Sequence, residues 1–162
     1  MGYTTIFKGR FKFDREVDPE LTRYINTFAR IRHVKRDVER YKEIHPDWVS
    51  KCFDGNPGTD GEYIVEENDN IWADSIDKII TGINTPPGKC PGLWCQWVIR
   101  NNKYLEWDQG EKFYKYVDWL KYLIDNFFAP KNYILNGKVS YQGEDENDNG
   151  IIEVINNKII VT

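Results

Sequence analysis

Residues 91–116 read PGLWCQWVIRNNKYLEWDQGEKFYKY and carry the clearest secondary-structure signals of the chain. Two short apolar runs, 93–100 and 103–107, flank Asn101-Asn102, a pair that tolerates the positive φ of a tight hairpin turn. Apolar residues at helical spacing follow over 111–128. The stretch therefore predicts a β-hairpin followed by a helix.

The first turn of this helix carries groups that have two interpretations. Asp108 fits the N-cap position, and Glu111 stands three residues later as its capping-box partner. Alternatively, the helix N-terminus could bind an anion with Lys112 as a phosphate partner, although the two carboxylates would oppose that anion. We expect the structural role for the carboxylates and keep Lys112 as a candidate ligand-binding residue.

The segments outside this stretch predict further strands and a second helix. Residues 3–13 alternate between apolar and basic side chains, which is typical of a half-buried strand. Asp18 and Pro19 fit the N-cap and the first position of a helix. Strands are expected over 133–142 and in a hairpin that turns at Asn156-Asn157.

Residues 37–90 carry weaker signals. Residues 37–61 look irregular, 62–65 suit a short strand, and a short helix is possible around Ile76. The whole pattern predicts an α+β fold, a mainly antiparallel sheet with two main helices packed on one face, in a single domain over residues 1–162. The other face of the sheet would carry Lys8, Arg10, Lys12, Lys138 and Gln142.

The composition excludes some classes of protein. The formal net charge is −4, which disfavours broad nucleic-acid binding because such binding needs a basic surface. No run approaches the roughly 18 apolar residues of a membrane span. No secretion signal is visible, so we expect a cytoplasmic protein with three reduced cysteines. The cysteines and histidines match no standard zinc spacing, so neither a metal nor a cofactor is predicted.

The chain shows no catalytic signature: it has no nucleophile elbow, no phosphate-binding loop and no dinucleotide fingerprint. One enzymatic alternative is a hydrolase in which two carboxylates converge in one pocket as acid and base. The candidates for that pair are Glu106, Asp108, Glu111 and Glu144. Residues 144–150 begin a calcium-loop pattern, but Asn156 stands where the closing glutamate is needed, so a polar turn is expected there.

Tryptophans and arginines supply the candidate binding groups. Trp94 and Trp97 fall on opposite faces of the predicted strand, so one can be core while the other stacks on a ligand ring. Arg32, Lys35 and Arg36 belong to the densest group of cations, and arginine suits phosphate through its bidentate fork. The alternatives are that both tryptophans are core and that the cations belong to a solvated helix end.

Short motifs in order along most of the chain carry a resemblance. They are GYTT (2–5), residues 32–37, NxPP (84–87), LWCQW (93–97), EWD (106–108), GEKFY (110–114), LNGxV (135–139) and QGE (142–144). In these segments the chain resembles a family of uncharacterised small proteins of tailed phages and some bacteria. The resemblance implies a shared fold and a role in counter-defence, such as a sponge that sequesters a host nucleotide signal.

We therefore expect a non-catalytic protein that binds and sequesters a small anionic, nucleotide-like ligand. The candidate ligand-binding residues are Trp94, Gln96, Trp97, Arg32, Lys35, Arg36, Lys112, Asn136 and Gln142. A homo-oligomer is expected, because such sites often lie between protomers and symmetric ligands favour symmetric dimers. The alternatives are a protein-binding inhibitor of a host factor, with an acidic rim over 144–148, and the hydrolase.

Overall fold

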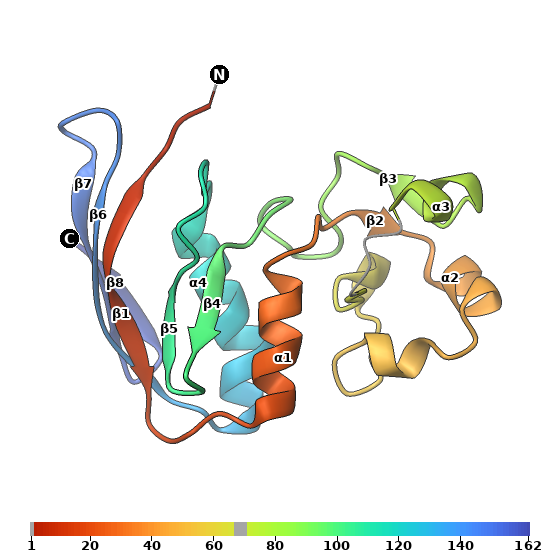
Figure 1. The fold of residues 1–162 in the computed structure, drawn as a ribbon, viewed down its shortest axis with the longest axis horizontal. Coiled ribbons are helices and arrows are strands. Elements are labelled where there is room, and N and C mark those ends of the chain that lie inside the picture. The colour runs from red at the N-terminus through yellow and green to blue at the C-terminus, as the bar shows by residue number, and fades with distance from the viewer. Residues whose placement is uncertain (1, 67–70) are drawn as a thin grey trace. The chain divides into compact units, whose positions relative to one another are not determined.

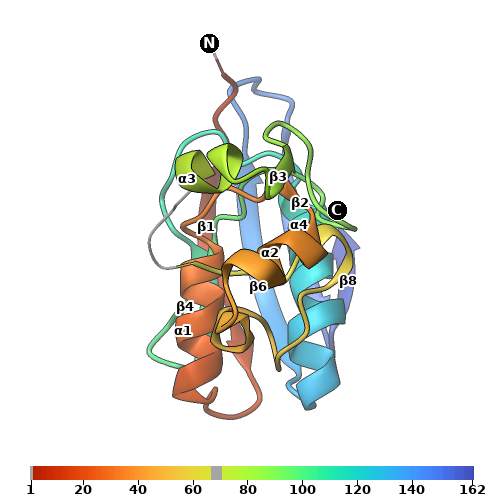
Figure 2. The ribbon, with the colours of Figure 1, turned by 90° about the vertical axis from the view of Figure 1, so that its right-hand side faces the viewer.

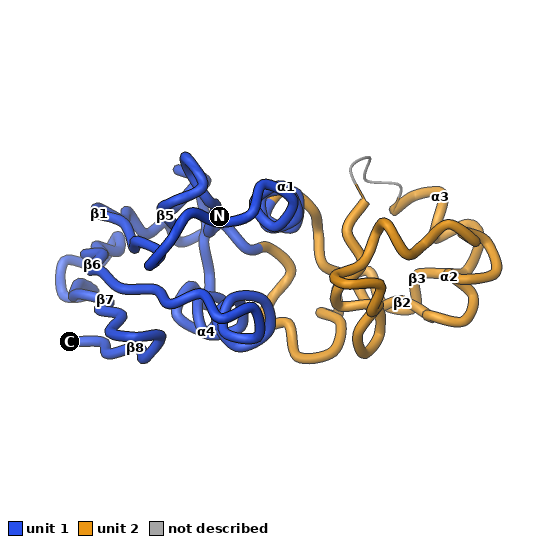
Figure 3. The backbone as a smooth tube through the Cα atoms, turned by 90° about the horizontal axis from the view of Figure 1, so that it is seen from below, with its two compact units in different colours: residues 1–29, 95–162 blue, residues 30–94 orange. Residues whose placement is uncertain are grey.

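The computed structural model describes residues 2–66 and 71–162. The chain divides into two compact units, residues 1–29 with 95–162 (unit 1) and residues 30–94 (unit 2) (Figure 3). Each unit is described by itself. The prediction that the whole chain forms a single domain stays a prediction.

Unit 1 is built on a six-stranded, fully antiparallel sheet with the strand order β4-β5-β1-β6-β7-β8. The strands are β1 (Ile6–Phe13), β4 (Trp97–Arg100), β5 (Tyr104–Trp107), β6 (Leu135–Gln142), β7 (Asn149–Ile155) and β8 (Lys158–Val161). The helices are α1 (Pro19–Phe28) and α4 (Tyr116–Leu123), and α4 continues into a π-helical turn (Ile124–Phe128) and a 3-10 turn (Ala129–Lys131). This architecture confirms the predicted α+β fold.

Both helices of unit 1 lie on the same side of the sheet and next to one another (Figure 1, Figure 2). Phe28 of α1 meets Trp119 of α4 with ring centroids 5.8 Å apart. The sheet supplies the other half of the core, because Phe7, Phe11 and Phe13 alternate with exposed residues along β1. The other face of β1 and β6 is left with the exposed side chains that the sequence predicted: Lys8, Arg10, Lys12, Lys138 and Gln142.

Local signals set the boundaries of several elements correctly. The Asp18 side chain accepts a hydrogen bond from the Glu20 N–H and caps α1, as predicted. Asn101-Asn102 and Asn156-Asn157 adopt positive φ at the turns of the two hairpins. Gly9 on β1 and Gly137 on β6 let the two strands approach closely. A Cβ on Gly137, where φ is +142°, would lie 2.8 Å from the Arg10 carbonyl oxygen.

The predicted start of the second helix is wrong. Helix α4 begins at Tyr116, after Lys115 in a left-handed conformation with no side-chain cap. Asp108 instead accepts a hydrogen bond from the Gly110 N–H at 2.7 Å, which forms a local turn rather than a capping box with Glu111. Residues 108–115 are therefore a loop between β5 and α4.

Unit 2 contains short elements around a small core. They are β2 (Lys35–Arg36), α2 (Val38–Ile44), α3 (Ile71–Ile76) and β3 (Ile80–Gly82), with 3-10 turns at Trp48–Lys51 and Thr59–Gly61. Strands β2 and β3 pair antiparallel. The core consists of Tyr41, Cys52, Ile64 and Ile79, with Trp48 packed against it.

The sequence predicted unit 2 only in part. Helix α3 confirms the short helix near Ile76, whereas α2 contradicts the irregular structure expected from residue 37. The strand expected over 62–65 is absent from the described residues, since Ile64 forms only an isolated bridge with Cys52. Among the described residues, no helix combines the length and the apolar character that crossing a bilayer requires.

Candidate functional site

The predicted ligand-binding residues are divided between the two units. Arg32, Lys35, Arg36 and Trp94 belong to unit 2. Gln96, Trp97, Lys112, Asn136 and Gln142 belong to unit 1. Each group is therefore considered within its own unit.

The structure separates the roles of Trp94 and Trp97. Trp97 is fully buried, and its ring packs edge-on against Phe7 and Phe11. Its indole N–H donates a hydrogen bond to the Tyr116 carbonyl at 2.9 Å. The prediction of Trp97 as a stacking residue is therefore wrong, because neither face of its ring is open to a ligand. Trp94 is 43% exposed and keeps an accessible ring.

Two of the predicted polar residues in unit 1 hold the protein itself together. The Gln96 amide donates to the Glu111 carbonyl at 2.7 Å, and its oxygen accepts from the Trp107 indole at 3.2 Å. The Asn136 side-chain oxygen accepts a hydrogen bond from the Asn156 N–H at 2.8 Å. Both residues therefore support loops, which sequence spacing alone could not distinguish from ligand contacts.

The cations of unit 2 do not form one open phosphate site. The Arg32 guanidinium donates to the Ile83 carbonyl at 3.0 Å and to the Asn84 side chain at 2.6 Å. Lys35 is half-buried, and Arg36 is buried. The alternative of a solvated helix end is also wrong for Lys35 and Arg36, since they form strand β2.

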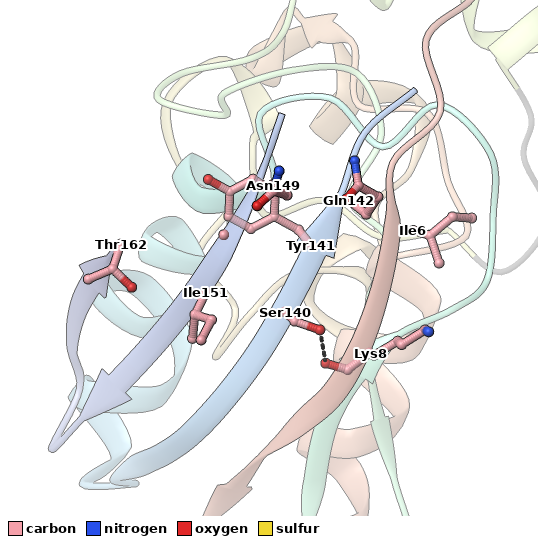
Figure 4. Close-up of a pocket in the computed structure, with 9 residues that line it drawn as sticks. Ile6, Lys8, Ser140, Tyr141, Gln142, Asn149, Ile151 and Thr162 are labelled. Carbon is pink, nitrogen blue, oxygen red and sulfur yellow. Dashed lines mark hydrogen bonds between the residues drawn. The ribbon is translucent and has the colours of Figure 1, made fainter. Parts of the chain in front are cut away.

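The outer face of the unit 1 sheet, the face that α1 and α4 do not cover, carries an open hollow of about 530 Å³. Figure 4 shows it over β1, β6 and β7, with Ile6, Lys8, Ser140, Gln142, Asn149 and Ile151 among its lining residues. Gln142 lies at one end, where its amide donates to the carbonyls of Gly143 and Asp145 at 3.0 and 3.1 Å. Of the predicted residues of unit 1, Gln142 is the one that lines this hollow.

Cationic side chains lie on the same outer face of the sheet as this hollow. The Arg10 guanidinium stacks over the Tyr104 ring at 3.6 Å, and Lys138 pairs with Glu153 at 3.5 Å. Lys8 and Lys12 are exposed and make no ion pair with any residue that the structure describes. Lys8 lines the hollow itself, so its ammonium group is available to an anion. Lys112 is exposed in the loop before α4, in a left-handed conformation.

Three of the four carboxylates considered for a hydrolase have structural partners. Glu106 lies 3.5 Å from Arg100, and Glu144 accepts a hydrogen bond from the Thr4 N–H at 2.7 Å. Burial raises the pKa of Asp108, while the hydrogen bond from Gly110 opposes that shift. Glu111 is exposed, and its backbone carbonyl accepts a hydrogen bond from the Gln96 side-chain amide.

Unit 2 contains a group that sequence spacing did not reveal. One ligand atom from each of His45, Glu66 and Asp74 lies within 4.8 Å of the other two, a separation that a metal ion could bridge. The three residues are separated by 21 and 8 positions in the sequence, and none stands in a recognised ligand motif. The fold of unit 2 brings together His45 at the end of α2, Asp74 on α3 and Glu66 from the segment between these helices.

Compared with known proteins, this α+β chain matches no family model, no curated protein and no solved structure. The resemblance to small phage proteins therefore stays a prediction.

Proposed function

We propose that the protein is a non-catalytic binder of a small anionic, nucleotide-like ligand, held on the outer face of the unit 1 sheet. The observation that carries the proposal is the hollow of about 530 Å³ on a face that also bears four cations. Small-molecule sites typically have volumes of roughly 300–1,000 Å³. The hollow therefore has room for a nucleotide.

The lining of the hollow offers the contacts that such a ligand needs. Lys8 supplies a charged donor for a phosphate oxygen. The Ser140 hydroxyl and the side-chain oxygens of Gln142 and Asn149 supply polar groups for the edge of a base or a sugar, while the two amide nitrogens donate to backbone carbonyls. Ile6 and Ile151 supply apolar contact for a ring. This set binds and orients a ligand without a nucleophile or an acid–base pair.

The biological role we propose follows from the resemblance. A binder without catalytic groups lowers the free concentration of its ligand in the cytoplasm, which is how a sponge would suppress a host defence signal. Sequestration requires the ligand to be released unchanged. A homo-oligomer remains part of this proposal, since a second copy would enclose an open sheet face.

Calorimetry and thermal-shift measurements with linear, cyclic and ADP-ribose-type nucleotides test this proposal. We expect one class of ligand to bind and to be recovered intact by chromatography. Lys8→Gln should weaken binding at least about tenfold, because a charge-assisted hydrogen bond contributes about 1.5–3 kcal/mol. The matched control is Lys103→Gln, which removes an equal charge from the hairpin turn outside the hollow.

Three outcomes would contradict the proposal. Absence of binding across the panel would reject a nucleotide-like ligand. Equal affinity of Lys8→Gln and Lys103→Gln would reject the hollow as the binding site. Recovery of an altered nucleotide would show turnover and would favour the hydrolase.

A second candidate function is the binding of a host protein, which is favoured by apolar side chains exposed on the same face of the sheet. Four isoleucines are exposed on it, Ile6, Ile151, Ile155 and Ile160. Exposed aliphatic side chains beside cations suit a protein partner as well as a small ligand. Ile160→Lys should abolish capture of a host protein, and it should leave nucleotide affinity unchanged because Ile160 does not line the hollow.

A further inference from the structure

Three elements of unit 2 place an imidazole and two carboxylates together. His45 ends α2, where its N–H donates to the Tyr41 carbonyl at 2.8 Å, and its side chain is partly exposed. Asp74 lies on α3 with its side chain 2% exposed, and Glu66 follows the 3-10 turn at Thr59–Gly61 with its side chain 6% exposed. His45 Nε2 lies 3.2 Å from Asp74 Oδ1.

Two polar atoms of this group lack partners among the described residues. Asp74 Oδ2 and Glu66 Oε1 are buried and form no hydrogen bond with any described residue. Lys51 Nζ lies 3.9 Å from Glu66 Oε1, which is beyond hydrogen-bond distance. The Tyr41 hydroxyl lies beside the Glu66 carboxylate, where it can donate a hydrogen bond to it. Buried polar atoms are nearly always satisfied, so an unsatisfied oxygen on each of two neighbouring carboxylates points to a missing partner.

We propose that His45, Glu66 and Asp74 bind one divalent first-row transition metal ion. One imidazole nitrogen and two carboxylates suit ions such as Zn²⁺, Mn²⁺ or Fe²⁺. Calcium requires six to eight oxygen ligands and fits this set poorly. The two carboxylates neutralise the charge of the ion. The metal takes up the lone pairs of Asp74 and Glu66 that hydrogen bonds leave unused.

The geometry is compatible with coordination after small side-chain movements. Ligand atoms about 2.1 Å from a tetrahedral metal lie roughly 3.4 Å apart. The His45–Asp74 separation of 3.2 Å is already close to this value. Rotation of a side chain closes the largest separation, which does not exceed 4.8 Å. The exposed edge of the His45 ring provides the route by which an ion enters from solvent.

The surrounding charges limit the affinity but do not exclude the site. Burial raises the pKa of the Cys52 thiol, and Arg36 and Lys51 oppose that rise, so these two cations lie close to the same core and also repel a metal ion. A water or anion in an open coordination position would offset this repulsion and would give the unpaired Arg36 Nε an acceptor. A simple ion pair of His45 with Asp74 would leave Asp74 Oδ2 without a partner and Glu66 Oε1 with the Lys51 ammonium at 3.9 Å alone.

The test uses the full chain, stripped with a chelator and then titrated with Zn²⁺ by calorimetry and with Co²⁺ by absorption. We expect one ion per chain, a rise in Tm at saturation, and a cobalt spectrum without thiolate charge transfer. Burial raises the pKa of the neighbouring Cys52 thiol to about 12, which disfavours it as a ligand. Absence of uptake by the folded wild-type chain would overturn the proposal. A thiolate charge-transfer band would overturn it too.

Substitutions then assign the ligands. Asp74→Asn and His45→Gln should each weaken Zn²⁺ binding at least about tenfold, because the first replaces an anionic oxygen ligand by a neutral one and the second removes the imidazole nitrogen. The control Glu39→Gln makes an equivalent change on α2 at a side chain that is 85% exposed, and it should bind like the wild type. Circular dichroism identifies any variant that fails to fold, in which case the wild-type titration decides. Unchanged affinity in both folded ligand variants would reject this site.

Discussion

The indole nitrogen of Trp97 lies 2.9 Å from the carbonyl oxygen of Tyr116 and donates a hydrogen bond to it. This bond joins β4 to the first residue of α4. The Gln96 amide makes a similar bond to the Glu111 carbonyl in the loop between β5 and α4. The tryptophan-rich hairpin therefore positions the second helix, which gives a structural role to the polar and aromatic groups that gather there.

Substitution of Trp97 should reduce stability and leave ligand binding unchanged. Trp97→Phe leaves the Tyr116 carbonyl without its donor and opens a small cavity, so we expect a loss of about 2 kcal/mol in the free energy of unfolding. Urea denaturation followed by circular dichroism measures it. Trp94→Phe is the control, because this exposed position should change stability by less than about 0.5 kcal/mol. A lower nucleotide affinity in the folded Trp97→Phe variant would contradict this prediction and would indicate that Trp97 contributes to ligand binding.

The last hairpin turn offers a matched pair of asparagines. The Asn157 side chain accepts from the Leu135 N–H at 2.7 Å and donates to the Tyr133 carbonyl at 2.9 Å. Asn157→Gly should therefore destabilise the protein by about 1–3 kcal/mol. Asn156→Gly keeps the backbone hydrogen bond to Asn136 and relieves a positive φ of 48°, so its unfolding free energy should change little. Equal denaturation midpoints for the two variants would contradict this assignment.

Asp108 should make stability depend on pH. Burial raises its folded-state pKa above the ordinary 3.8, so the folded protein holds this proton more tightly than the unfolded chain. The resulting stability is fully present below that ordinary value and is lost as the pH rises through the higher folded-state pKa. Asp108→Asn retains an acceptor for Gly110 and removes this loss.

Denaturation of the wild type and of Asp108→Asn over a pH series checks the sign. The variant should gain stability relative to the wild type as the pH rises from acidic to neutral. A relative loss of stability over the same range would show that the Gly110 hydrogen bond, and not burial, dominates the environment of Asp108.

The thiol of Cys52 should be unreactive in the native state. Burial raises its pKa to about 12, against the opposing influence of Arg36 and Lys51, so roughly one thiol in ten thousand is ionised at pH 8. Cys90 and Cys95 are also buried. A chromogenic disulfide reagent should therefore label no cysteine in the native state and three in urea. Rapid native labelling, assigned to Cys52 by mass spectrometry, would show that the unit 2 core opens.

Short-range signals determined the elements whose boundaries rest on a few neighbouring residues. Asp18 with Pro19 fixed the start of α1, because a capping side chain and a ring with preset φ act within one turn. The two asparagine pairs fixed the hairpin turns, since asparagine tolerates positive φ. Alternation along 3–13 predicted which side of β1 would be buried, because successive strand side chains point to opposite faces.

Tertiary structure decided what depends on residues distant in the sequence. Trp94 and Trp97 look equivalent locally, and only packing against β1 buried one of them. Asp108 and Glu111 form a sequence pattern typical of a helix N-terminus. The hydrogen bonds that Gln96 and Trp97 make to the Glu111 and Tyr116 carbonyls nevertheless hold residues 108–115 as a loop, and the helix begins at Tyr116. The His45, Glu66 and Asp74 group has no local signal, because its three ligand atoms meet only after the chain folds around Tyr41 and Ile79. Contacts between side chains that are distant in the sequence form only when the core packs, so a short stretch of sequence cannot predict them.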